Sequence, residues 1–108
     1  MNDLEIIKKV IYDVANEYNI KIDKIILFGS RARGDYREDS DYDILIITED
    51  KLDKDLYDNL WCDIHYYLVN SLNKSVDLLI VDNQEFDKRS KSKLFVYYWA
   101  KNEGKILL

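Results

Sequence analysis

Residues 29–47, GSRARGDYREDSDYDILII, decide the fold and suggest the chemistry of this chain. Their last part belongs to a predicted strand over 42–48 that is apolar after Asp43, as expected for a strand covered on both faces. Asp41 and Asp43 lie two residues apart at the start of this strand, so their carboxylates would point to the same side. The Gly-Ser turn at the start of the stretch would present backbone N–H groups to an anion. Together these features predict a site for a metal-bound polyphosphate.

The segments around this stretch alternate between helical and strand patterns. Apolar periodicity predicts helices over about residues 3–18, 53–72 and 83–102, and strands over 24–28, 42–48 and 76–81. Asp82 and Glu85 have the spacing of a capping arrangement at the start of the last helix, and Gly104 should end it. The chain contains no proline, and it shows no repeat or low-complexity linker. We therefore expect an α/β fold in which a small three-stranded sheet is packed with helices, forming one domain over residues 1–108.

Composition limits the classes of protein to consider. A chain of 108 residues with 47% hydrophobic and 34% charged residues suits one small soluble domain. No apolar run approaches the roughly 20 residues that cross a bilayer, and the N-terminus does not resemble a signal peptide, so we expect a cytoplasmic protein with no membrane partner. The net charge of −5 argues against direct binding to nucleic acid.

A third carboxylate, that of Asp77, lies on the predicted strand after Asp41 and Asp43. Adjacent strands are about 4.8 Å apart, so neighbouring strands would bring the three carboxylates together. Such a cluster is repulsive unless a hard cation such as Mg²⁺ neutralises it. The alternative is that all three are solvated strand-end acids, in a chain with 21 acidic residues. The Gly-Ser turn at a fixed distance favours the metal site.

The same residues resemble a known signature. Gly29, Ser30, Asp41 and Asp43 fit the G-S-x10-D-x-D pattern of the minimal nucleotidyltransferases, a branch of the DNA polymerase beta superfamily, in which GSRARG is also typical. The resemblance covers nearly the whole chain, because the superfamily core is a mixed three-stranded sheet with helices in this order. Its third carboxylate, on the following strand, matches Asp77. The resemblance thus implies the polymerase beta-like nucleotidyltransferase fold.

The resemblance also implies an enzyme with a two-metal mechanism. An acceptor hydroxyl would attack the α-phosphorus of a nucleoside triphosphate such as ATP, and pyrophosphate would leave. Asp41 and Asp43 would be the catalytic residues that hold two Mg²⁺ ions, or Mn²⁺ ions, while Asp77 would complete the shell of one metal.

The same resemblance assigns nucleotide-binding residues. Gly29 would let the backbone approach the phosphates, and Ser30 would add its hydroxyl and N–H to the β and γ oxygens. Arg31 and Arg33 either neutralise the triphosphate or are solvated arginines on a short helix, and the sequence leaves both interpretations open.

The acceptor is expected to be held by another protein, because only one helix and a short tail follow the last predicted strand. Members of the minimal family commonly pair with a helical HEPN-domain protein, and such a pair can be a toxin–antitoxin system in which AMP is added to a tyrosine of the partner. Our first hypothesis is this antitoxin-type protein adenylyltransferase. The alternatives are transfer to a small molecule with help from a partner subunit, and a non-catalytic module that silences a HEPN partner by contact.

Two further features bear on partners. Nine tyrosines and two tryptophans are more than a small core can hide, which suggests an interface. A basic run, Lys88, Arg89, Lys91 and Lys93, is either a solvated helix face or a surface for an acidic partner or RNA.

Overall fold

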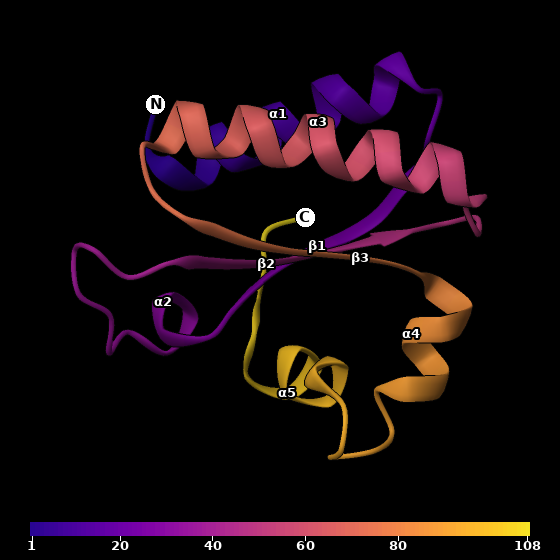
Figure 1. The fold of residues 1–108 in the computed structure, drawn as a ribbon. Coiled ribbons are helices and arrows are strands. Elements are labelled where there is room, and N and C mark those ends of the chain that lie inside the picture. The colour runs from indigo at the N-terminus through magenta and orange to yellow at the C-terminus, as the bar shows by residue number, and fades with distance from the viewer.

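A central sheet lies between two layers of helices in the computed structural model, which describes all 108 residues (Figure 1). Its elements in chain order are α1 (Asp3–Glu17), β1 (Ile22–Phe28), α2 (Ser30–Arg33), β2 (Tyr42–Thr48), α3 (Lys54–Leu72), β3 (Val76–Asp82), α4 (Asn83–Arg89), α5 (Val96–Glu103) and β4 (Lys105–Ile106). None of these helices has the length and apolar content needed to span a membrane. The α/β class predicted from the sequence is confirmed.

The sheet is mixed, with strand order β3-β2-β1-β4. β2 is parallel to β3, whereas β1 is antiparallel to both β2 and β4. The register pairs Asp43 on β2 with Asp77 on β3, and it pairs Phe28, the last residue of β1, with Asp43 on the other side. Three strands therefore place their ends at the two predicted carboxylates.

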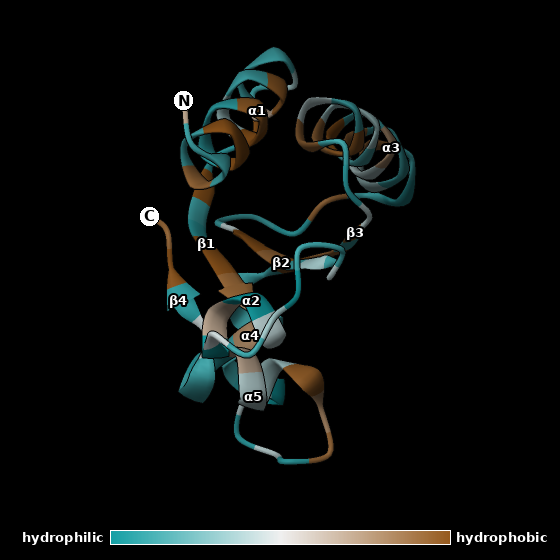
Figure 2. Cartoon of the chain, turned by 90° about the vertical axis from the view of Figure 1, so that its left-hand side faces the viewer, coloured by the Kyte–Doolittle hydropathy of each residue, from teal (hydrophilic) through white to brown (hydrophobic).

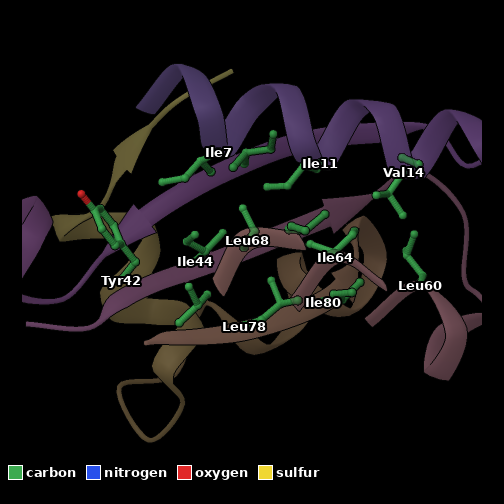
Figure 3. Close-up of a cluster of buried hydrophobic side chains, with 14 of the residues drawn as sticks. Ile7, Ile11, Val14, Tyr42, Ile44, Leu60, Ile64, Leu68, Leu78 and Ile80 are labelled. Carbon is green, nitrogen blue, oxygen red and sulfur yellow. The ribbon is translucent and has the colours of Figure 1, made fainter. Parts of the chain in front are cut away.

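The alternation of side chains along the strands builds two apolar layers. On one face α1 and α3 cover the larger cluster, which includes Ile7, Ile11, Ile44, Ile46, Leu60, Ile64, Leu68, Leu78 and Ile80 (Figure 3). On the other face α4 and α5 cover a smaller cluster of Ile26, Leu45, Ile47, Val81, Phe86 and Ala100. Because β2 is buried on both faces, its sequence after Asp43 is almost continuously apolar.

Polar side chains begin three of the helices. Asn2, Asp53 and Asp82 each accept a hydrogen bond from the backbone N–H three residues later, at 2.9, 2.8 and 3.0 Å respectively. Each bond satisfies a donor that the first helical turn would otherwise leave without a partner. The predicted capping arrangement at Asp82 is confirmed, and so is the end of the last helix at Gly104.

The single helix predicted over residues 83–102 is wrong, because the chain turns between α4 and α5. α4 ends at Arg89, the buried Ser90 follows, and Phe95 has an extended backbone before α5 begins. Serine side chains compete for backbone hydrogen bonds, which favours a break in this segment. After the break, Phe86 on α4 and Ala100 on α5 both pack against the same face of the sheet.

The sheet has four strands, so the prediction of three is also corrected. The segment after Gly104 forms β4, in which Ile106 pairs with Ile26, and the N–H of Leu107 donates to Ile25 O at 2.8 Å. β1 would otherwise present a free edge whose backbone groups lack protein partners. A Cβ at Gly104 would overlap the Ile26 side chain, so glycine permits this approach.

Candidate functional site

Asp43 and Asp77 form an acidic pair at the start of β2 and β3. They are register partners on adjacent parallel strands, and Asp43 is half-buried whereas Asp77 is exposed. Asp43 lies two residues before Leu45, and Asp77 lies four residues before Val81, so both carboxylates point to the face covered by α4 and α5. The prediction that these two carboxylates lie side by side is thus confirmed.

The surroundings of Asp43 disfavour its charged form. Burial is the first cause that raises the pKa of Asp43 to about 6, followed by a hydrogen bond and charge repulsion from Asp77 and the charge of Asp41. The positive charge of Arg33 opposes this rise. A carboxylate pair in this state gains from a nearby cation, because the cation removes the repulsion that favours protonation.

Asp41 lies just outside β2 and is exposed. Nowhere in the chain do three or more aspartate, glutamate, histidine or cysteine side chains form a group that could hold a metal ion by themselves. The predicted triad is therefore assembled only in part, with Asp43 and Asp77 adjacent and Asp41 near enough for its charge to act on Asp43. This oxygen donor set fits Mg²⁺, which usually binds one or two carboxylates together with substrate phosphates and water.

The predicted Gly-Ser turn lies directly against the acidic pair. Gly29 has a φ of 71°, and a Cβ at this position would overlap Oδ2 of Asp43. Glycine is therefore required both by the backbone conformation and by the close approach of the carboxylate. Ser30 starts the short helix α2, whose first turn has no side-chain cap. The turn and the carboxylates thus form one site rather than two.

The two arginines of α2 have different surroundings. Arg33 is exposed, lies 3.4 Å from Asp35, and is close enough to lower the pKa of Asp43. Arg31 instead turns toward the loop before β2, where its guanidinium donates to backbone carbonyls. Of the two arginines that the sequence left undecided, Arg33 is therefore the better placed to meet an anion at the acidic pair.

Two neighbouring features were not predicted from the sequence. Phe28, Leu79 and Tyr97 pack against the smaller cluster, so they lie on the same face of the sheet as the acidic pair. The i, i+2 spacing of Asp77 and Leu79 was the signal that could have placed them on one face. Between the loop before β2 and the turn before β3, a polar pocket of about 780 Å³ is lined by Arg37, Glu38, Asp39, Asn73, Lys74 and Ser75.

Comparison with known proteins identifies a family and a relative. The family described as "Polymerase beta, Nucleotidyltransferase" matches residues 8–97. "Putative protein adenylyltransferase MJ0141" of Methanocaldococcus jannaschii is 48% identical over 50 residues, which are 46% of this chain and 50% of that protein. The match with this curated relative thus spans about half of its length.

Solved structures share the fold. A chain in the crystal structure of a toxin–antitoxin with AMP-PNP superimposes with a TM-score of 0.63 and 26% identity, over 100% of this chain and 73% of that chain. A chain in the structure of a tri-AMPylated Shewanella oneidensis HEPN toxin in complex with MNT antitoxin has a TM-score of 0.56 and 22% identity, covering 97% and 71% respectively. At that identity the second likeness shows the fold alone.

Proposed function

The chain belongs to the polymerase beta nucleotidyltransferase family, and from this premise we propose that it transfers AMP from ATP to a hydroxyl group of a partner protein. The observation that best supports this proposal is the pairing of Asp43 with Asp77 directly against the Gly29 turn. An acidic pair next to backbone donors suits a metal-bound triphosphate, which needs cations on one side and N–H groups on the other.

The residues of the site would divide the work. Asp41 and Asp43 would hold two Mg²⁺ or Mn²⁺ ions and Asp77 would complete one shell; these ions, when bound, would neutralise charge on the triphosphate and the leaving pyrophosphate. Ser30 would hold β and γ oxygens through its hydroxyl and N–H, and Arg33 would add a positive charge.

The transfer itself would exchange a phosphoanhydride bond of ATP for a phosphoester bond to the acceptor. The acceptor oxygen bonds to the α-phosphorus, the bond from that phosphorus to the bridging oxygen breaks, and pyrophosphate leaves. The acceptor proton passes to Asp77, whose side chain is exposed and can reach a hydroxyl presented from outside the chain.

We propose a HEPN-domain toxin as the acceptor protein, with one of its tyrosines as the site of AMPylation, so that this chain acts as the antitoxin. MJ0141 is named as a protein adenylyltransferase, and the neighbour at 26% identity belongs to a toxin–antitoxin structure with AMP-PNP. The neighbour at 22% identity adds only that the same fold occurs in a complex with an AMPylated HEPN toxin. The supply of ATP inside cells suits the cytoplasm as the compartment of this reaction.

The surface that would receive this partner is the segment over residues 88–101, which we call the basic aromatic face. It contains five lysine and arginine residues and no acid, although the chain has a net charge of −5. Leu94 is 91% exposed and Trp99 is 45% exposed, and the start of α5 is coloured apolar in Figure 2. Exposed apolar groups among cations match an acidic protein surface with apolar residues. Tyr97 on α5 packs against the smaller cluster, so this segment covers the same face of the sheet to which Asp43 and Asp77 point.

Intact-mass spectrometry of the partner tests the proposal. The HEPN-domain protein is incubated with this chain, ATP and Mg²⁺, and its mass should rise by one or more adenylyl groups. Asp43→Asn should give no mass change while still folding, because it removes one metal-binding carboxylate of the pair. If the partner is silenced without a change in mass, and Asp43→Asn silences it equally well, the non-catalytic module replaces the enzyme. If wild type and Asp43→Asn both leave the partner unmodified and active, the proposal is wrong.

A further inference from the structure

The loop that leads into the acidic pair has little packing of its own. Residues 35–39 are all exposed, and Asp41 is the last residue before β2. An exposed loop without buried side chains needs another source of order. Since Asp41 is itself exposed, its position depends on how the chain around it is held.

The guanidinium of Arg31 holds this loop by its backbone. Nη2 donates to Glu38 O at 2.9 Å and to Ser40 O at 3.0 Å, and it also approaches Arg37 O at 3.3 Å. Nε donates to Ser40 O at 3.2 Å. The loop closes on itself around these carbonyls, because the N–H of Arg37 donates to Ser40 Oγ at 2.8 Å. One side chain of α2 thus donates hydrogen bonds to the backbone carbonyls of three loop residues.

Two tyrosine rings complete the surroundings of Arg31. The guanidinium carbon lies 4.6 Å from the ring centroid of Tyr36 and 4.3 Å from that of Tyr42. Tyr42 is buried, and its hydroxyl hydrogen-bonds Asp3 on α1, so this ring is fixed to the core. Arg31 therefore contacts the residue on each side of Asp41: the carbonyl of Ser40 and the ring of Tyr42.

These contacts leave Arg31 poorly suited to hold a triphosphate. Its Nε and Nη2 donors face backbone carbonyls, and Nη1 lies 3.4 Å from the Tyr42 hydroxyl. We propose that Arg31 is a positioning residue, which fixes the loop and so sets the place of Asp41 relative to Asp43. This inference rests on the proposed function, because it assigns Asp41 a part in holding the metal–nucleotide.

A lysine at position 31 separates positioning from charge neutralisation. Lysine keeps the positive charge, but a single ammonium cannot donate in one plane to several carbonyls or stack in the same way. If Arg31 bound phosphate only through its charge, Arg31→Gln would weaken ATP binding, whereas Arg31→Lys would retain most of the affinity. If Arg31 positions the loop, Arg31→Lys and Arg31→Gln should behave alike.

The experiment compares Arg31→Lys and Arg31→Gln with Arg33→Gln as the contrasting variant. Three quantities are measured: amide hydrogen exchange over residues 35–41, the affinity for ATP without metal, and the affinity for Mn²⁺ in the presence of ATP. Both Arg31 variants should exchange faster in the loop and bind Mn²⁺ about tenfold more weakly, the scale of losing an outer-shell contact. Their metal-free ATP affinity should remain close to wild type. Arg33→Gln should show the reverse pattern: amide exchange in the loop should stay at the wild-type rate, and ATP binding without metal should be weaker.

Circular dichroism checks that each variant folds. Tyr36→Leu tests the same positioning role by removing one of the rings that contact Arg31, and because Tyr36 is 49% exposed, its removal leaves the core intact. Tyr36→Leu should speed loop exchange and weaken Mn²⁺ binding less than the Arg31 variants do. Unchanged loop exchange in the Arg31 variants, or full recovery by Arg31→Lys, would overturn the positioning role while leaving the proposed function intact. A wild-type chain that binds neither ATP nor Mn²⁺ would instead overturn the proposed function, and with it the role of Arg31.

Discussion

Trp61 Nε1 on α3 donates a hydrogen bond to Leu78 O on β3, at 2.9 Å. One turn further along α3, His65 Nε2 lies 3.1 Å from Val76 O, and the two rings stack at 4.6 Å. β3 is an outer strand of the sheet, and β2 is its only strand neighbour. The helix therefore supplies side-chain donors to carbonyls that would otherwise line a free edge, an arrangement that protects a sheet from pairing with other chains.

Trp61→Phe should destabilise the fold by about 1–2 kcal/mol, because it leaves the carbonyl of Leu78 without its donor in a partly buried position. Urea denaturation measures the loss. Trp99→Phe is the matched control, since Trp99 Nε1 also donates to a backbone carbonyl, that of Lys93 at 3.1 Å, but in an exposed place where water can replace it. Equal losses in the two variants would contradict the edge-protecting role.

The acidic pair should make folding stability depend on pH. The pKa of Asp43 is about 6 in the folded chain, above its ordinary value of 3.8, so the folded state binds this proton more tightly than the unfolded state. The corresponding stability is present in full below about pH 4 and is lost as the pH rises to about 6. At pH 7 the ionised carboxylate of Asp43 therefore destabilises the folded state.

Asp43→Asn should remove this dependence and raise the free energy of unfolding at pH 7 by about 2 kcal/mol, from roughly 1.4 kcal/mol per pKa unit with a discount for partial exposure. Urea unfolding of both proteins at pH 4, 5, 6 and 7 gives the difference curve. A difference that stays constant across this range, or one that favours wild type at pH 7, would show that the pair is not strained. Addition of Mg²⁺ with ATP should reduce the difference by stabilising wild type alone.

Much of this architecture was accessible from local patterns. The predicted strand over residues 42–48 coincides with β2, and the helix predicted over 53–72 agrees with α3 to within one residue at its start. These elements are set by their own periodicity and by capping side chains such as Asp53. The pairing of Asp43 with Asp77 also followed from the positions of the two residues on strands expected to be neighbours.

The features that were missed depend on contacts between distant residues. β4 exists because β1 offers a free edge, and nothing in the two residues Lys105 and Ile106 indicates a strand on its own. The chain turns between α4 and α5, and both helices pack against one face of the sheet, a tertiary arrangement that apolar periodicity does not reveal. The direction of Arg31 depends on where the loop folds back, so the sequence could name the arginine but could not choose between its two roles.

Gly29→Ala should be much more damaging than Gly34→Ala. Both glycines have a positive φ, of 71° and 92°. Gly34 is in the left-handed region, where alanine costs about 1–2 kcal/mol, whereas the ψ of −157° at Gly29 belongs to a region that essentially only glycine adopts. Only at Gly29 would the new methyl group overlap Asp43, whereas nothing lies within 4 Å at Gly34. Gly29→Ala should therefore add a steric cost and displace Asp43, so that Mn²⁺ binding in the presence of ATP is lost.

A double variant isolates the clash between these two residues. In an Asp43→Ala background the carboxylate is gone, and Gly29→Ala should then cost less in urea unfolding than it does in wild type, because the backbone strain remains but the overlap with Oδ2 does not. The cycle needs only stability measurements, so it does not depend on the catalytic proposal. Additive effects of the two substitutions would mean that Gly29 and Asp43 do not constrain one another.

Reversal of charge on the basic aromatic face should weaken binding of the HEPN-domain partner. Lys91 and Lys93 are exposed, and the double change to glutamate alters the net charge by −4 without touching the acidic pair. Replacement of attraction by repulsion at an interface should lower the affinity by about tenfold or more, with a stronger effect at low ionic strength. Isothermal titration of the partner measures this.

Lys8→Glu with Lys9→Glu is the matched control, because it makes the same change in net charge on α1, which lies on the other face of the sheet. ATP affinity should stay at its wild-type value in both double variants. Equal weakening by the two double variants would mean that only net charge matters. If wild type binds RNA and the Lys91/Lys93 double variant does not, the surface belongs to nucleic acid instead.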